Sequence, residues 1–496
     1  MDKLRARNRR FWEGKDRMKL IFPLLFISLL FGCASFHPRP ISPSETATKF
    51  ETRTLQSKKL ESFIEKNIHK KEIPWPPASW DFKMLSLAAA YYSPALDVMR
   101  AKWGVANAAV ITAGGIPNPA IGFLGQHHSS TPGGISPWTW GLSLNVPIET
   151  AGKRGYRIKQ AKHLSVAARL NIAETSWQVW SGARKSLLDL YAATEREKYL
   201  LSQLRVQEEV ARLFGERLAA GESSQFEVTQ SRLALDKTRL ALALNQKKKA
   251  AARGELATAL GLQAKALGHI RISFDIFNQA PGPIDLRDSR RKALLGRSDI
   301  LAALQEYEAS QSALQLEIAK QYPDIHIGPG YEWDQGDNKW SLGFSIVLPV
   351  FNQNQGPIAE AKARRKEFAA KFIAIQAGVL GQIDQAEEAY CESLKNLRIA
   401  GSLVSAEDSN LKAIQARFNS GEAGRLDLEQ AKMELASTEL SRFDTLILAQ
   451  ADLGELEDAV QRPLGKMEFF PGMAAPYLRA TRPEGKKSIK GKGEKK

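Results

Sequence analysis

The sequence contains few of the side chains that crosslink small folds through disulfides or bind soft metal ions. Its 496 residues include two cysteines, seven methionines and seven histidines. Two cysteines cannot support a disulfide scaffold, and the methionines form no cluster that would relay Cu(I). The chain also lacks a phosphate loop and the Gly-x-Ser-x-Gly, His-Glu-x-x-His and Cys-x-x-Cys motifs. We therefore predict no enzyme activity, no cofactor and no metal site. The adjacent His127 and His128 are interpreted as part of a solvated loop. Cys391 lies inside a predicted helix and is expected to be a buried small side chain.

Long hydrophobic runs are also missing, since a membrane-spanning helix needs about 20 apolar residues. The longest run follows Met18, is about a dozen residues long and ends at Gly32-Cys33, which is typical of a signal peptide. With Leu30 and Gly32 before Cys33 it resembles a bacterial lipoprotein signal, although Phe31 departs from that pattern. We predict lipidation of Cys33, with plain cleavage nearby as the alternative. The charged stretch before Met18 is long for such a leader, so Met18 is the expected start.

Excess charge is confined to the two ends of the chain. The net charge is +16, of which residues 1–32 contribute +5 and residues 479–496 contribute +6. The 446 residues between them hold only +5. Because the body carries no concentrated basic surface, nucleic acid is not an expected partner.

Proline is absent from two long windows, 148–280 and 358–462, although the chain contains 23 prolines. Both windows are rich in strong helix formers, so each is predicted to be a helical hairpin. A single helix from Lys153 to Leu218 would be on the order of 100 Å long, which no compact domain accommodates. Apolar residues seven apart, such as Phe226, Leu233 and Leu240, indicate coiled-coil-like packing.

The two windows are copies of each other. The segment RLAAGESSQFEVTQSRLAL (217–235) aligns with RFNSGEAGRLDLEQAKMEL (417–435), and Gly141 and Pro147 align with Gly343 and Pro349. The period of about 200 residues indicates duplication of half the chain rather than a solenoid repeat.

Each half opens with segments that alternate like β-strands. Apolar residues alternate with small or polar ones in 138–147 (WTWGLSLNVP), 340–349 (WSLGFSIVLP) and 323–333, and less cleanly in 118–126. Strands of about ten residues with one apolar face match transmembrane strands, and a soluble sandwich is the alternative. Four strands are too few to close a barrel, so closure would need several copies.

This plan resembles the TolC family of outer-membrane efflux channels over roughly residues 85–470. The segments that carry the resemblance are VPIETAGKRGYRIKQA (146–161), YPDIHIGPGYEWD (322–334), LPVFNQNQGPIAEAKA (348–363) and the two Gly-Glu turns. The first and third look most like the heavy-metal subgroup, the partners of cobalt–zinc–cadmium pumps. The resemblance implies an α+β membrane protein with four transmembrane strands and long coiled-coil helices per protomer. Three protomers, each with an internal two-fold repeat, would form a β-barrel continued by an α-barrel.

The expected organisation follows that family plan. It comprises a signal peptide (1–33), an N-terminal linker and equatorial segment (34–90), two structural repeats (91–280 and 281–470) and a disordered basic tail (471–496). Pro147 and Pro349 would end strands at the membrane boundary, and 127–137 and 334–339 would be external loops. The expected aromatic girdle at the lipid interface consists of Trp138, Trp140, Tyr331, Trp333 and Trp340.

The two hairpin turns become the periplasmic tip on that plan. The residues expected to contact a periplasmic adaptor (a membrane fusion protein) are Gly221, Glu222, Gly421, Glu422 and Arg425; the glycines could instead simply end helices. Glu227 and Asp427 either cap helices, as the capping box at Ser224 indicates, or form an acidic ring in the lumen.

The function expected from the resemblance is a passive exit duct of a tripartite pump. It would be a homotrimer in the outer membrane of a Gram-negative bacterium, anchored by lipid, with its helices in the periplasm and an inner-membrane RND-type pump as partner. Heavy-metal cations or toxic small molecules are the expected cargo. The alternatives are a duct for drugs or for type I protein secretion, and a periplasmic coiled-coil scaffold lipoprotein without a pore.

Overall fold

The computed structural model describes residues 34–68, 74–268, 270–285 and 287–464. The chain divides into two compact units, one ending at Thr52 and the other beginning at Arg53. The first contains helix α2 (Pro43–Glu51), which begins with Pro43 directly after the capping residue Ser42. The predicted signal peptide with Met18 and Cys33, and the predicted basic tail at 471–496, lie outside the described residues.

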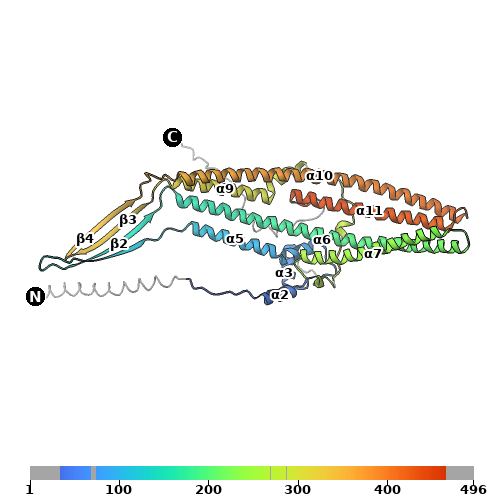
Figure 1. Cartoon of the computed structure of the whole chain (residues 1–496), viewed down its shortest axis with the longest axis horizontal. Coiled ribbons are helices and arrows are strands. Elements are labelled where there is room, and N and C mark those ends of the chain that lie inside the picture. The colour runs from blue at the N-terminus through green and yellow to red at the C-terminus, as the bar shows by residue number, and fades with distance from the viewer. Residues whose placement is uncertain (1–33, 69–73, 269, 286, 465–496) are drawn as a thin grey trace, which may run out of the picture. The chain divides into compact units, whose positions relative to one another are not determined.

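The second unit has the same order of elements twice (Figure 1). Its first helices are α3 (Lys58–Ile68) and α4 (Phe82–Tyr92). The first copy is α5 (Pro94–Ala113), β1 (Ala120–His127), β2 (Trp138–Ile148), α6 (Lys153–Ala219) and α7 (Gln225–Ala259). Two 3-10 turns, η1 (Ala264–Leu267) and η2 (Asp275–Phe277), and α8 (Arg287–Gly296) follow. The second copy is α9 (Ser298–Ala319), β3 (Ile325–Asp334), β4 (Asp337–Ile346), α10 (Gln355–Asn419) and α11 (Arg425–Val460).

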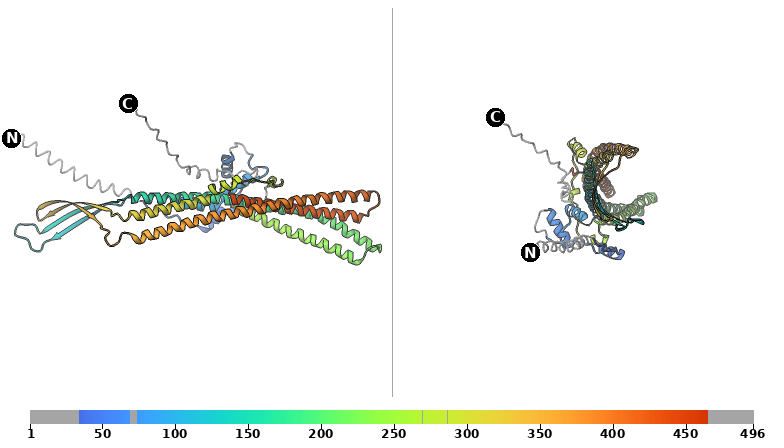
Figure 2. Two further views of the ribbon diagram at one scale, coloured as in Figure 1. Left: turned by 90° about the horizontal axis from the view of Figure 1, so that it is seen from above. Right: turned by 90° about the vertical axis from the view of Figure 1, so that its left-hand side faces the viewer.

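The proline-free windows form the predicted helical hairpins. Helix α6 has 67 residues and α10 has 65, and each turns back into a shorter helix that packs along it. Figure 2 shows α6 and α7 as one pair and α10 and α11 as the other, with the strands at the opposite end of the long helices. In the described part of the chain, no helix combines the length and apolarity needed to cross a lipid bilayer.

The four predicted strands form one antiparallel sheet in the order β1-β2-β3-β4. The prediction of an external loop at 334–339 is wrong, because β3 and β4 are joined by Gln335 and Gly336 alone. Both residues have positive φ, 53° and 110°, which fits the right-handed twist of a tight two-residue hairpin. The other connection begins at His128, since His127 is the last residue of β1.

Strand register places all five residues of the predicted aromatic girdle on one face of the sheet. Trp140 lies opposite Trp333, and Tyr331 lies opposite both Leu142 and Trp340; residues directly opposite in an antiparallel pair point to the same side. The rings of Trp138 and Trp140 stack with centroids 5.3 Å apart. The other face carries small and polar residues apart from Leu124 of β1, so the predicted alternation is confirmed for β2, β3 and β4 and is less clean in β1, as expected.

The main hydrophobic core surrounds the middle of α6. Trp80, Phe82 and Trp180 all belong to this core, and the rings of Phe82 and Trp180 have centroids 5.3 Å apart. Phe277 of η2 is fully buried in the same cluster. A smaller core around Ile383 and Tyr390 joins α10 to the end of α11. The prediction that Cys391 is buried is wrong: it lies on the exposed side of α10, one residue beyond the buried Tyr390.

A buried ion pair joins the two copies where α6 meets α11. Arg184 Nε lies 3.3 Å from Glu457 Oε2, and both side chains are almost completely buried. Arg184 also donates to the Gln450 carbonyl (3.1 Å), and Glu457 accepts from the Leu464 N–H (2.9 Å). Burial lowers the pKa of Arg184, while Glu457 and Asp458 act to raise it. Gly454 makes room for the guanidinium, because a Cβ there would collide with Nη1.

We expect Arg184→Met to lower the free energy of unfolding by about 3–5 kcal/mol, because it leaves Glu457 buried without its cation. Arg184→Met combined with Glu457→Leu should recover most of that loss. Gly454→Ala should be costly in the wild-type chain but tolerated with Arg184→Met. Denaturant unfolding of detergent-solubilised protein measures each change, and additive single effects would contradict the coupling.

Candidate functional site

The two helical turns end α6 and α10 in the same way. After α6, the Gly221 N–H donates to the Leu218 carbonyl (3.0 Å) and the Glu222 N–H to the Arg217 carbonyl (2.7 Å). Gly421 and Glu422 repeat this pattern with distances of 3.1 and 2.8 Å. The glycines have φ of 79° and 80°, as this helix-ending motif requires. The helix-ending role of the glycines is therefore confirmed, and their predicted contact with an adaptor stays a prediction.

Carboxylates cap the helices that leave both turns. Glu227 Oε2 accepts from the Ser224 N–H (2.7 Å) while Ser224 Oγ accepts from the Glu227 N–H (3.3 Å), which confirms the predicted capping box. Hydrogen bonds to the Glu227 carboxylate from the Ser224 N–H and then from the Ser223 and Ser224 hydroxyls hold the pKa of Glu227 below its usual value. At the second turn Asp427 Oδ2 accepts from the Gly424 N–H (2.8 Å). Glu227 and Asp427 thus cap separate helices; a ring of such carboxylates stays a prediction.

An ion-pair cluster links the two hairpins near the turns. Arg425, the first residue of α11, places Nη2 2.7 Å from Glu209 Oε1 on α6. Arg212 holds the same carboxylate with two hydrogen bonds of 2.6 and 2.8 Å. Hydrogen bonding to Arg212, together with the charges of Arg212 and Arg425, lowers the pKa of Glu209 to about 2. We call Arg425 and Glu209 the tip clamp. It remains charged at any pH above that value.

A cleft of about 600 Å³ lies beside the clamp, between the two hairpins. Its walls come from Val210 on α6, Ala234 on α7, Ile414 on α10 and Met433 on α11. Gln207, also in the wall, is buried and accepts from Thr238 Oγ1 (2.6 Å). The cleft therefore separates part of the two hairpins beside the clamp, while Val228 and Leu428 close to the turns are buried.

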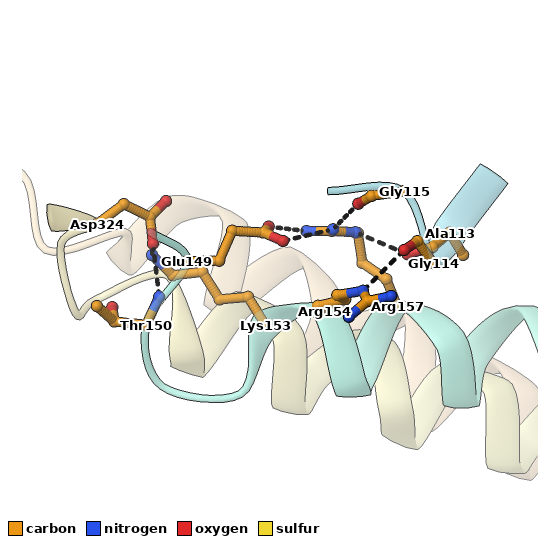
Figure 3. A network of polar contacts seen from close by, with 9 residues as sticks. All are labelled: Ala113, Gly114, Gly115, Glu149, Thr150, Lys153, Arg154, Arg157 and Asp324. Atoms are coloured by element: carbon orange, nitrogen blue, oxygen red, sulfur yellow. Dashed lines mark hydrogen bonds and ion pairs between the residues drawn. The ribbon is translucent and has the colours of Figure 1, made fainter. Parts of the chain in front are cut away.

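The segment 149–157 builds the corner between β2 and α6 (Figure 3). Ala151 and Gly152 turn the chain with positive φ, 53° and 72°. Lys153 Nζ and the Thr150 N–H then both donate to Asp324 Oδ1, at 2.7 and 2.9 Å, just before β3. Burial acts to raise the pKa of Asp324, but these hydrogen bonds outweigh it and the pKa is lowered. The corner of the first copy is thereby fixed to the connection between α9 and β3 of the second.

Two arginines of this segment hold the end of α5. Arg154 Nε donates to the Gly114 carbonyl (2.7 Å), and Arg157 Nη2 to the Gly115 carbonyl (3.3 Å) and to Glu149 Oε2 (2.9 Å) (Figure 3). The positive guanidinium groups meet the carbonyls left open at a helix C-terminus. This segment therefore sets the position at which strands continue into helices.

Other predicted residues lie close to their expected places. Pro147 is the second-last residue of β2 rather than its end, and Pro349 lies three residues beyond β4. His127 packs edge-on against Trp138, and His128 Nε2 lies 3.0 Å from Thr139 Oγ1. Within the described ranges, no cluster of three or more His, Cys, Asp or Glu side chains could hold a metal ion.

The sequence matches the family model described as outer membrane efflux protein over residues 86–262 and 290–460. The chain belongs to this family. The two matched segments cover both copies of the duplicated plan, including both turns and the corner at 149–157.

Relatives of this outer membrane efflux protein agree with the predicted plan. It is 25% identical over 328 residues to the cobalt-zinc-cadmium resistance protein CzcC of Cupriavidus metallidurans, covering 64% of this chain and 75% of CzcC. The solved structure of VceC from Vibrio cholerae has a TM-score of 0.62 at 19% identity, covering 77% of this chain and 97% of VceC. CusC gives a TM-score of 0.62 at 17% identity and covers 86% and 99%. The TolC-like α+β fold predicted from the sequence is confirmed.

Sequence reasoning missed the partners of the charged residues. Arg425 was predicted to be a functional residue but Glu209 was not. The segment that contains Lys153 was recognised, but no role was predicted for Lys153 itself. The spacing Glu209-x-x-Arg212-x-x-x-Glu216 does indicate charge pairs on one helix face. It cannot indicate which cation of another helix completes the cluster.

We expect Ser224→Ala to weaken the first turn of α7 by about 1 kcal/mol, because Ser224 Oγ caps the Glu227 N–H. Amide hydrogen exchange should then be roughly fivefold faster there. Ser223→Ala is the matched control, because Ser223 Oγ contacts only the Glu227 carboxylate in this cap. Equal effects of both changes would contradict the capping role.

Acidification should loosen the same turn. The pKa of Glu227 is lowered in the folded chain, so the stability it contributes is present above the ordinary glutamate value of 4.5 and is lost as pH falls through the lower folded value. The amide hydrogen-exchange rate at this turn, corrected for intrinsic rates, should be constant near neutral pH. It should rise as the pH falls below 4.5 toward the folded pKa of Glu227. In Glu227→Gln it should not rise.

Proposed function

We propose that this outer membrane efflux protein is the homotrimeric exit duct of a tripartite pump. The observation that carries the proposal is the sheet: β1 pairs only with β2 and β4 only with β3, so within the described residues each leaves one edge open. Long open edges invite pairing with another chain. Pairing β4 of one copy with β1 of the next would satisfy both edges, and three copies follow the family plan.

The exposed face of the sheet supports contact with outer-membrane lipid. Phe123, Leu142 and Phe344 share the face of the aromatic girdle by strand register and are 71%, 54% and 75% exposed. Such a surface on a ten-residue strand suits acyl chains, and the girdle suits their interface with water. Lipidation of Cys33 would add an anchor at the same membrane.

Heavy-metal cations are the proposed cargo. The support is the likeness to a cobalt-zinc-cadmium resistance protein together with the segments at 146–161 and 348–363. A duct has no energy source of its own, so an inner-membrane RND-type pump and a periplasmic adaptor complete the assembly. The adaptor would contact the turns at Gly221-Glu222 and Gly421-Glu422, and Glu227 and Asp427 would favour cations there.

The tip clamp supports gating at the turns. Arg425 and Glu209 join the hairpins beside the cleft and belong to neither hydrophobic core, so removing the ion pair loosens the tips without disturbing a core. Adaptor binding would open the duct by separating the same helices.

Conductance in planar bilayers tests the duct. Purified protein should form cation-permeable channels, whereas a coiled-coil scaffold without a pore gives none. Deletion of the gene should lower tolerance to zinc, cobalt, cadmium, copper or silver. Unchanged tolerance to all five metal ions, with conductance retained, would contradict heavy-metal cations as the cargo. The protein would then be a duct for drugs or for secreted proteins.

We expect Arg425→Ala and Glu209→Gln each to raise channel open probability severalfold, because either change breaks the clamp. Arg364→Ala is the control, since Arg364 forms an exposed ion pair with Glu360 within α10, far along the chain from the turns. Single-channel recording measures all three. Identical open probabilities would contradict the clamp's role in gating.

A further inference from the structure

Positive charge on both long helices is concentrated at the end next to the sheet. Residues 153–173 of α6 include six Lys or Arg and no Asp or Glu, whereas residues 174–219 include seven of each sign. Residues 355–373 of α10 include five Lys or Arg and two Asp or Glu, whereas residues 374–419 include four and six. The small net charge of the chain between its two ends is therefore unevenly distributed, and a basic band follows the strands in both copies.

Nearby carboxylates neutralise only part of this band. Four lysines in it are exposed and outside the ion pairs: Lys159 and Lys162 on α6, and Lys362 and Lys366 on α10. Among the residues that the structure describes, none of these ammonium groups has a carboxylate within 4.0 Å. Lys159 Nζ lies only over the ring of Tyr156, 5.6 Å from its centroid. We call these four lysines the basic belt, and each is free to bind an anion.

The two lysines of α6 lie on the side of that helix that packs against α4. Lys162 precedes Trp180 by 18 residues, which is five turns of an α-helix, so the two side chains share a face. Trp180 packs against Phe82 of α4, with ring centroids 5.3 Å apart. Lys159, three residues before Lys162, lies on the same face one turn closer to the sheet.

The two lysines of α10 lie on the side of that helix that contacts α8. Lys366 precedes Asp384 by the same 18 residues, and Asp384 pairs with Arg290 of α8 (2.5 Å). Lys362, four residues earlier, shares that face. The end-on view in Figure 2 shows the short helices α4 and α8 on the convex side of the curved layer of strands and long helices. The convex side is the outer side when several copies close a barrel, so the basic belt faces outward.

The connection between β4 and α10 adds an exposed apolar stretch between the strands and the belt. Val347, Leu348 and Val350 are 73%, 69% and 68% exposed, and Phe351 is 100% exposed. Large apolar side chains that gather on a surface mark contact with another apolar body. The connection directly follows the strand that carries Phe344 on the face proposed to contact lipid. The acyl chains that meet that face are therefore the apolar body that the connection fits.

We infer that the basic belt binds the phosphate groups of anionic phospholipids in the periplasmic leaflet of the outer membrane, with the connection 347–351 among the acyl chains of the same lipids. The inference rests on the proposed outer-membrane duct and names the lipid that its periplasmic edge recognises.

The spacing of the two features fits one lipid leaflet. At 1.5 Å per residue, the four lysines lie about 9–17 Å beyond the first residues of their helices. A lysine side chain extends its ammonium group toward the headgroups while its methylene stem covers apolar surface. Anionic headgroups attract such lysines, whereas zwitterionic headgroups carry no net charge. The order along the chain is thus apolar strand, apolar connection and basic belt, which matches the order of acyl chain and phosphate in a leaflet.

The first test measures how strongly the full-length protein holds spin-labelled lipids in phosphatidylcholine bilayers. We expect wild-type protein to prefer phosphatidylglycerol to phosphatidylcholine severalfold, since one lysine near an anionic headgroup contributes a factor of roughly five. The preference should vanish at about 1 M salt, where the Debye length is about 3 Å. It should also vanish in a fourfold glutamine variant and persist in the corresponding fourfold arginine variant, which keeps the charge. The glutamine variant combines Lys159→Gln, Lys162→Gln, Lys362→Gln and Lys366→Gln.

The matched control removes the same number of charges from exposed lysines farther from the sheet. It combines Lys185→Gln, Lys237→Gln, Lys247→Gln and Lys412→Gln. This control should keep the wild-type preference for phosphatidylglycerol. Equal preferences in the control and the belt variant, or no preference in the wild-type protein, would overturn the inference and leave the duct in place. A wild-type protein that immobilises neither lipid would instead overturn the membrane-embedded duct.

The second test places a nitroxide probe on the apolar connection. Attached to Phe351→Cys in a Cys33→Ser, Cys391→Ser background in phosphatidylglycerol vesicles, the probe should be more accessible to oxygen than to a water-soluble nickel chelate. Oxygen concentrates among acyl chains and the chelate stays in water. The same probe at Lys366→Cys should show the opposite order. A probe at position 351 shielded from both reagents would mean that a second copy covers the connection. That result, or an accessibility typical of water, would overturn the contact with acyl chains.

Discussion

The placement of α11 against α6 determines how the two copies of the repeat act as one protein. The contact that fixes this placement is the ion pair of Arg184 and Glu457. Both side chains are buried, and Gly454 leaves room for the guanidinium. A charge pair in that environment tolerates little displacement, since a shift of either partner leaves a desolvated charge. Because both helices are long and stiff, this register carries through to Arg425 and Glu209 at the tip. At the other end, Lys153 and Asp324 hold the corner between β2 and α6 to the connection between α9 and β3.

Features that depend on neighbours in the sequence could be predicted well. The helical hairpins could be predicted from the placement of proline, because the loss of helix stability caused by a proline depends only on the neighbouring residues. The turns at Gly221 and Gly421 and the cap at Glu227 were recognisable because each uses residues within a few positions of one another. The residues that share each face of the sheet could be predicted for the same reason, from the alternation of apolar and polar residues along each strand. The tight turn at Gln335-Gly336 was missed, since a two-residue loop needs strands that extend further than their apolar pattern.

Features that depend on contacts across the fold could not be predicted. Nothing in the sequence near Arg425 indicates that its ion-pair partner is Glu209, which lies 216 positions earlier. Cys391 was expected to be buried because it lies inside a predicted helix and unpaired cysteine is among the residues most often buried. It is exposed because it lies on a side of α10 that no other element covers in the described part of the chain.

Duplication followed by divergence explains why a chain with two copies differs from one with a single copy. Identical repeats would carry identical charges on equivalent helices. Here the two copies have diverged, so Arg425 on α11 has Gln225 as its counterpart on α7. Arg425 and Asp444 on α11 form ion pairs with Glu209 and Arg196 on α6, and these contacts keep the two hairpins of the chain in register.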